Sequence, residues 1–205
     1  MHIALYGATG RVGSELLRLL LADGHSVTAL VRDKTACILH DHMSIIEGDV
    51  LHQRDVFRSM KGCDVVLSAL NTEGGSTLST SMPYIVESMK REGITRIVTI
   101  GTAGILQARS NPSLYRYESS ESRRTSSRAA IDHRKAYETV KQSAVDWTIV
   151  CPTHLIDGRA TYTYRVEEEV LPLGGTTITV GDTAHFAYEV LMKSSFHLTR
   201  VGISY

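Results

Sequence analysis

The chain has 205 residues, which is enough for one well-buried domain and short for two. Lysine plus arginine and aspartate plus glutamate both number 22, so net charge gives no electrostatic case for a nucleic-acid or anionic-membrane partner. The three cysteines lack metal-binding spacing, and no segment resembles a signal peptide or a membrane span, so we expect a cytoplasmic protein with reduced thiols.

Short apolar runs alternate with helical patterns along the chain, which is typical of βαβ units. Strands are predicted at 3–7, 26–31, 44–49, 64–70, 96–101, 147–152 and 176–182. Helices are predicted at 12–22, 53–61, 82–92 and 132–143, and a last helix follows Asp182, which is predicted to cap it. We therefore predict a single α/β domain over residues 1–205, with a Rossmann-like, doubly wound parallel sheet of six or seven strands.

Residues 107–130 interrupt this alternation, and we predict a mobile surface loop there. Within it, the stretch 109–128 (RSNPSLYRYESSESRRTSSR) holds seven serines and five arginines and has little to bury. It follows the fifth predicted strand, at the end of the sheet where doubly wound folds bind ligands. A lid over that end of the sheet is the alternative to a plain surface loop.

The stretch YGATGRVGSE carries three glycines, Gly7, Gly10 and Gly13, between the first predicted strand and the first predicted helix. The first permits a tight turn, the second lets the backbone approach a pyrophosphate, and the third lets the helix pack on the strand. The helix N-terminus then offers unpaired N–H groups and a positive dipole end to phosphates. We predict a dinucleotide site at this turn, held by Gly7, Thr9, Gly10, Arg11 and Val12.

The end of the second predicted strand should distinguish the cofactors, because it reaches the adenosine ribose. Arg32 stands there and can pair with a 2′-phosphate through two N–H bonds, which favours NADPH. The adjacent Asp33 would instead accept a hydrogen bond from a ribose hydroxyl, so NADH stays possible. Asp49 and Val50 follow the third predicted strand, where an adenine edge would lie, and an ordinary turn is the alternative there.

The motifs GATGRVG, LVRD, GDV, GCDVVLSAL and RIVTIGTAG follow one another along the chain. Their order and spacing resemble the atypical short-chain dehydrogenases, most of all the NAD(P)H-binding group that includes flavin reductase/biliverdin-IXβ reductase. The resemblance covers nearly the whole chain and implies an acceptor site at the carboxyl ends of strands four to six. The residues at these ends are Leu70, Asn71 and Thr72 for the cofactor and, for catalysis, Thr102 and His154, where the resembled reductases carry a serine and a histidine.

Tyr137 and Lys141 spell the Tyr-x-x-x-Lys pair with which catalytic short-chain dehydrogenases move a proton. Measured against Pro152, which ends the sixth predicted strand, Tyr137 lies about nine residues too late, or about 13 Å along a helix. Ala129 and His133 fall near the family's tyrosine and lysine positions instead. We therefore interpret Tyr137 and Lys141 as an ordinary helical pair.

Without a positioned proton donor, ketone reduction is disfavoured, whereas hydride transfer to a large π-system delocalises charge and lets solvent supply the proton. The sequence therefore predicts an NAD(P)H-dependent reductase whose acceptor is a flavin, a quinone or a tetrapyrrole-like molecule. The alternatives are an NmrA-like redox sensor that binds dinucleotide without turnover, and a sugar epimerase or dehydratase. We expect no metal site, because the histidines at 40, 42 and 52 are typical of solvated loops.

Overall fold

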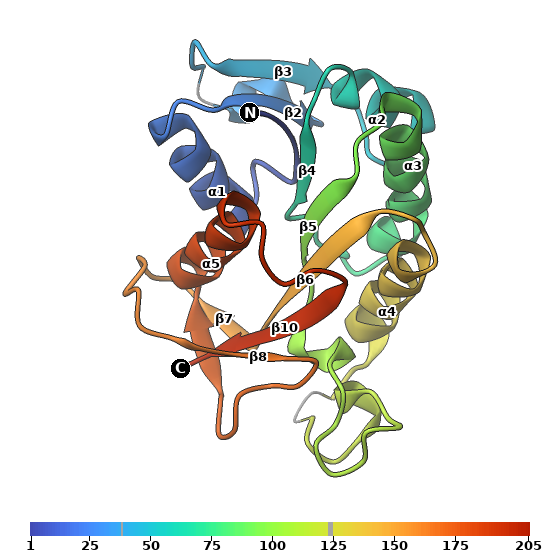
Figure 1. The fold of residues 1–205 in the computed structure, drawn as a ribbon, viewed down its shortest axis with the longest axis vertical. Helices are drawn as coiled ribbons and strands as arrows, with labels where there is room; N and C mark the ends of the chain where they lie inside the picture. The colour runs from blue at the N-terminus through green and yellow to red at the C-terminus, as the bar shows by residue number, and fades with distance from the viewer. Residues whose placement is uncertain (38, 123–124) are drawn as a thin grey trace.

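An eight-stranded sheet runs through the molecule in the computed structural model, which describes residues 1–37, 39–122 and 125–205. Its strands are β1 His2–Tyr6, β2 Ser26–Val31, β3 Met43–Glu47, β4 Val65–Ser68, β5 Arg96–Ile100, β6 Asp146–Pro152, β8 Arg165–Glu168 and β10 Thr199–Ser204. They lie in the order β3-β2-β1-β4-β5-β6-β10-β8, and only the edge pair β10–β8 is antiparallel (Figure 1). The predicted Rossmann-like α/β fold is confirmed.

Helices cover both faces of this sheet. α1 Arg11–Ala22 and α5 Val180–Met192 pack together on one face, while α2 Gln53–Met60, α3 Thr77–Glu92 and α4 Arg128–Lys141 line the other (Figure 1). Successive side chains of β1 point to opposite faces of the sheet, and those on both faces are apolar, so both faces must be covered by helices. Ile3 and Leu5 join the core beneath α1 and α5, whereas Ala4 and Tyr6 join the core beneath the other three helices. Among the described residues, no helix has the length and apolar character that a membrane span requires.

The C-terminal part of the sheet differs from the prediction. The strand expected at 176–182 is only β9 Thr177–Thr179, which pairs with β7 His154–Ile156 in a separate two-stranded sheet. The seventh parallel strand is β10, which the sequence pattern did not indicate, because Arg200 in its middle looks like a surface residue. In the fold Arg200 is 3% exposed, and its guanidinium binds the Glu169 carboxylate and the Ile105 carbonyl.

The starts of three helices, α3, α4 and α5, also differ from the prediction. Asp182 does not cap α5; Thr179 does, because its hydroxyl accepts the Asp182 N–H at 3.1 Å. The Asp182 carboxylate instead accepts the backbone N–H groups of Thr161 and Tyr162, each at 2.8 Å, and so fixes the loop after β7. α3 starts at Thr77 rather than at 82, and α4 starts at Arg128 rather than at 132.

The start of α3 is set from another helix. Asp132 of α4 is buried, and its carboxylate accepts the N–H groups of Leu78 and Ser79, each at 3.1 Å, together with the Ser79 hydroxyl. These are N–H groups that a helix leaves without partners in its first turn. The two helices that flank the end of β5 are therefore tied together at that end.

The arginine- and serine-rich segment is bonded to the rest of the protein at several points. Gln107 donates its N–H to the Glu169 carbonyl at 2.8 Å, and Arg116, in the short turn Arg116–Glu118, donates to the Leu106 carbonyl at 2.7 Å. α4 takes residues 128–130 from the predicted loop, and Arg123 and Arg124 lie outside the described residues. The mobility of the segment stays a prediction.

Candidate functional site

The turn after β1 is shaped by its glycines. Gly7 has a φ of +80°, and a Cβ there would lie 2.6 Å from the Ala69 carbonyl oxygen. A Cβ on Gly13 would lie 1.9 Å from the Gly7 carbonyl oxygen. Gly10 is different, because a Cβ there would meet only the Gly7 carbonyl oxygen, at 3.3 Å. The protein itself requires glycine at 7 and 13, while the space beside Gly10 is open to a ligand.

The first turn of α1 presents backbone donors. Gly10 is its N-cap and has no side chain with which to satisfy the first N–H groups of the helix, and the first turn holds no acidic residue. Val12 packs its side chain into the core, so only its backbone can meet a phosphate. Thr9 is exposed beside it. This arrangement suits a pyrophosphate group.

Arg11 is the first residue of α1 and already has an anionic partner. Its Nη1 atom lies 3.0 Å from Oδ1 of Asp157, in the loop after β7. The two side chains are 59% and 84% exposed. An ion pair this exposed contributes on the order of 0–1 kcal/mol, so a phosphate oxygen can replace the aspartate at little cost.

Arg32 and Asp33 point to different partners. Arg32 donates from Nη1 and Nη2 to the two carboxylate oxygens of Glu73, at 2.9 and 2.8 Å. Asp33 accepts the hydroxyl of Thr35 at 2.6 Å and its backbone N–H at 2.8 Å, and these two bonds lower the pKa of the Asp33 carboxyl. Asp33 thereby caps the short turn Lys34–Ala36, which leaves Arg32 as the group directed across the end of the sheet.

The two residues predicted near an adenine edge have local bonds. Asp49 accepts the Leu51 N–H at 2.9 Å, as in an ordinary turn, and Val50 is buried in the core. These contacts are those of the alternative that the sequence left open. An adenine contact from this turn stays a prediction.

The loop after β4 lies against the glycine turn, since the Ala69 carbonyl sets the space at Gly7. Leu70 is half-buried and packs on the core. Asn71 is exposed, and its side-chain oxygen accepts the N–H of Thr72 at 2.7 Å. Thr72 is 4% exposed. Of these predicted cofactor residues, Asn71 is the one whose side chain is exposed at this edge of the sheet.

Thr102 and His154 leave the same edge of the sheet. β5 and β6 are parallel, with Ile100 opposite Val150, so the chain segments that follow them start side by side. Thr102 is half-buried, and its hydroxyl accepts the Gly104 N–H at 3.4 Å, which leaves the hydroxyl proton for a ligand. His154 is exposed on β7. The structure thus brings both predicted residues to the same edge of the sheet.

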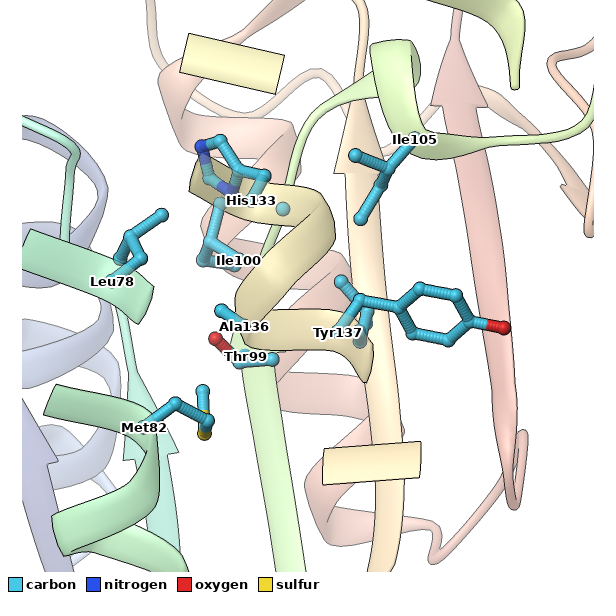
Figure 2. A pocket seen from close by; sticks show the side chains of 10 residues that line it. Leu78, Met82, Thr99, Ile100, Ile105, His133, Ala136 and Tyr137 are labelled. Atoms are coloured by element: carbon cyan, nitrogen blue, oxygen red, sulfur yellow. The ribbon is translucent and has the colours of Figure 1, made fainter. Parts of the chain in front are cut away.

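Tyr137 belongs to the core. It is 4% exposed, its ring packs edge-on against Trp147 with centroids 5.5 Å apart, and the Arg200 guanidinium carbon lies 4.4 Å from its centroid. Nζ of Lys141 lies 5.5 Å from the same ring. Figure 2 shows the phenol oxygen pointing away from the side chains of His133 and Thr99. These contacts agree with an ordinary helical pair.

A small cavity lies between α3, α4 and the end of β5 (Figure 2). It measures about 10 Å³, roughly the room of a single water. Its lining includes Leu78, Met82, Thr99, Ile100, Ile105, His133, Ala136 and Tyr137. A flat acceptor does not fit inside, so it would have to bind at the surface of this edge. Cys151 is no nucleophile for it, because burial raises its pKa to about 12.

Comparison with known proteins agrees with this geometry. The sequence profile of a family described as NAD(P)H-binding matches residues 7–194. The chain belongs to this NAD(P)H-binding family. The predicted resemblance to an NAD(P)H-binding group is thereby confirmed.

Solved structures of the same fold match the whole chain. A candidate exported protein from Burkholderia pseudomallei is 26% identical, with a TM-score of 0.86 and full coverage of both chains. A candidate epimerase from Bacteroides thetaiotaomicron is 29% identical, with a TM-score of 0.86 and 96% of that chain covered. A candidate NADH-flavin reductase from Streptococcus pneumoniae is 23% identical, with a TM-score of 0.81 and 99% of that chain covered. This last likeness supports the fold alone.

Two acidic residues of this NAD(P)H-binding protein escaped the sequence reasoning. Glu73 and Asp157 hold the two arginines that we predicted to meet phosphates. Both follow strand ends, as Thr72 and His154 do, so the positional rule that selected those residues could have found them. The sequence could not reveal the pairing itself: Glu73, after β4, binds Arg32, after β2, and Asp157, after β7, binds Arg11 at the start of α1.

Proposed function

We propose that this chain is an NADPH-dependent reductase that passes hydride to a flavin, a quinone or a tetrapyrrole-like acceptor. The observation that carries the proposal is the burial of Tyr137 against Arg200. Ketone reduction and sugar epimerisation need a positioned acid or base, and the phenol that spells the dehydrogenase motif is in the core. A conjugated acceptor spreads the added charge over its π-system, so solvent can deliver the proton afterwards.

The nucleotide end supports NADPH as the hydride source. The backbone at Gly10 and Val12 fits a pyrophosphate, and Arg11 can exchange Asp157 for a phosphate oxygen. Arg32 offers its two-pronged donor face to a 2′-phosphate. Asp33 is bonded to Thr35 and so is turned away from a ribose hydroxyl, which makes NADH the weaker candidate.

At the acceptor end, we propose that the Thr102 hydroxyl donates a hydrogen bond to the acceptor and that His154 contacts its edge. The arginine-rich segment contributes less than its sequence suggested. Arg109 donates to the Leu171 carbonyl at 3.0 and 2.8 Å, and Arg116 donates to the Glu121 carbonyl at 2.8 Å. Among the described arginines of the segment, Arg128 is the better candidate to bind an anionic group of the acceptor, because it is exposed in the first turn of α4.

The deciding experiment measures NADPH oxidation by the purified protein with FMN, FAD, several quinones and biliverdin, one at a time. Turnover with one of these, weakened by Thr102→Ala and by His154→Ala, is the expected result. Tight NADPH binding without turnover on any of them would favour a redox sensor. Interconversion of nucleotide sugars would favour the activity named for the Bacteroides relative.

We propose a small-molecule partner and a cytoplasmic setting for this activity. The three cysteines are free, which suits a reducing compartment. The equal numbers of acidic and basic residues offer no broad attraction for nucleic acid or anionic lipid. Cell fractionation checks the compartment, since the relative from Burkholderia is described as exported.

A further inference from the structure

An ion pair crosses the sheet above the end of β1. Arg32 follows β2 and Glu73 follows β4, and β1 lies between these two strands. The two bonds between them, at 2.9 and 2.8 Å, use both carboxylate oxygens and two guanidinium nitrogens. The glycine turn begins at the end of β1, and the loop that carries Glu73 packs against it at Gly7. The pair therefore lies across the path of a dinucleotide bound at that turn.

The carboxylate of Glu73 occupies the donors that a 2′-phosphate needs. Arginine binds a carboxylate or a phosphate through the same two-pronged face, so the two anions exclude each other there. A carboxylate left beside the phosphate would also repel it. A 2′-hydroxyl carries no charge, so it requires no such exchange, and a carboxylate at that place can accept a hydrogen bond from it.

The competing carboxylate comes from an unexpected place. In dinucleotide-binding folds, the acidic residue that reads the ribose belongs near the end of strand two. Here Asp33 stands there but is bonded to Thr35, while Glu73, from the far side of β1, reaches Arg32. Glu73 has a φ of 49°, a conformation that a non-glycine residue seldom adopts. The loop thus holds an acidic side chain at a position where glycine would fit more easily.

We propose that Glu73 sets the discrimination between NADPH and NADH by competing with the 2′-phosphate for Arg32. This inference rests on the cofactor site of the proposed function and is independent of the acceptor. The two side chains are 67% and 49% exposed, so their bond is weak enough to open when the phosphate arrives. NADPH binding then releases the 71–76 loop from β2, whereas NADH binding leaves the bridge closed.

The test measures dissociation constants for NADP⁺ and NAD⁺ by calorimetry, with wild type, Glu73→Gln, Arg32→Gln and the double variant. Glu73→Gln should tighten NADP⁺ about three- to fivefold, the upper end of what an exposed ion pair contributes, and change NAD⁺ by less than about twofold. In the Arg32→Gln background, the Glu73 substitution should have no effect on NADP⁺. The gain should also shrink at high salt.

Asp157→Asn is the matched control, because it releases Arg11 from an equally exposed pair. Arg11 faces the pyrophosphate, which both cofactors share, so the NADP⁺/NAD⁺ ratio should stay constant. An unchanged ratio in Glu73→Gln overturns the inference. Weaker NADP⁺ binding overturns it too, since Glu73 would then only hold Arg32 in place. The expected ratio together with a failure to reduce any acceptor upholds the inference and rejects the reductase.

Discussion

The two ends of the proposed site, the nucleotide end at the turn after β1 and the acceptor end after β5 and β6, are held in place by different kinds of interaction. At the nucleotide end, the backbone itself sets the geometry, through contacts between Gly7, Gly13 and the loop after β4. At the acceptor end, irregular segments are fixed by buried polar side chains that come from far along the chain. Arg200 reaches the carbonyl of Ile105, 95 residues away in the sequence. One end of the site is therefore shaped by backbone contacts around a short glycine motif, and the other by contacts between residues far apart in the sequence.

Arg200 is the main fixing point of the acceptor end. Its guanidinium binds Glu169 and the Ile105 carbonyl, and it lies 4.4 Å from the ring centroid of Tyr137 and 5.5 Å from that of Tyr115. Ile105 lies in the turn after β5, and Glu169 directly follows β8, so Arg200 joins these two segments to β10. The rings supply a face on which a buried cation is favourable. Without this residue, the acceptor edge should lose its shape before the nucleotide end does.

The largest expected effect is therefore that of Arg200→Met. Removing the buried guanidinium leaves the partly buried Glu169 carboxylate with only the Thr199 hydroxyl and the N–H of residue 200, and the free energy of unfolding should fall by about 3 kcal/mol. Arg165→Met is the control: Arg165 bonds the Leu173 and Tyr205 carbonyls from an exposed position, and its loss should cost about 1 kcal/mol. Urea unfolding measures both. Equal losses in the two variants would contradict the special role of Arg200.

The nucleotide end can be broken by a single methyl group. Gly13→Ala places a Cβ 1.9 Å from the Gly7 carbonyl oxygen, and we expect a loss of about 3 kcal/mol in stability. Gly10→Ala meets only an atom at 3.3 Å, so stability should change by about 0.5 kcal/mol or less. The same Gly10→Ala change should weaken NADPH roughly tenfold, because the methyl occupies the phosphate's approach. Thermal unfolding and NADPH titration of both variants check this contrast.

The same division explains what the sequence could predict. The glycine spacing, the strand–helix alternation and the buried strands of the nucleotide end all follow from short-range patterns, and the fold confirmed them. β10 was missed because its buried arginine depends on Glu169 and Ile105, which no local pattern connects. The capping role given to Asp182 was wrong for the same reason. Its carboxylate binds Thr161 and Tyr162, which lie 21 and 20 residues earlier in the chain, and no local pattern connects them to it.

Asp182 offers a test that depends on pH. Burial by itself would raise the pKa of its carboxyl, but hydrogen bonds from Tyr205, Thr161, the Tyr162 N–H and Thr179 outweigh burial and hold the pKa below its usual value of 3.8. A lowered pKa means stability that is present above 3.8 and lost as pH falls through the folded value. Asp182→Asn should therefore cost about 2 kcal/mol at neutral pH.

The difference between wild type and Asp182→Asn should stay constant from neutral pH to about pH 5 and narrow at more acidic pH. Urea unfolding at a series of pH values measures it. Asp41→Asn replaces an exposed aspartate far along the chain; it provides the control and should change the free energy of unfolding by about 0.5 kcal/mol or less at neutral pH. A gap that stays constant down to pH 3 would mean that the Asp182 carboxylate is not held in its charged form by these bonds.

Within the site itself, the sequence predicted positions better than partners. Arg32, Thr102 and His154 all stand at strand ends, where the spacing put them. Their bonding could not be foreseen, because Glu73 reaches Arg32 only once β1 lies between β2 and β4. Strand order depends on the whole sheet, and it cannot be predicted from a short run of residues.

The smallest expected effect belongs to the residue with the most suggestive motif. Tyr137→Phe keeps the ring that packs on Trp147 and Arg200, so we expect a stability change below about 1 kcal/mol and kcat within about threefold of wild type. Tyr137→Ala removes the ring and should cost about 3–5 kcal/mol, with little change in kcat for the protein that stays folded. A large effect on stability with little effect on turnover is what we expect of a core residue.

A phenol that donates a proton in the reaction would behave in the opposite way: the Phe variant would fold normally and lose a hundredfold or more in kcat. That outcome would return the chain to the dehydrogenases and epimerases, and steady-state kinetics of the Phe variant with its best acceptor decides between the two.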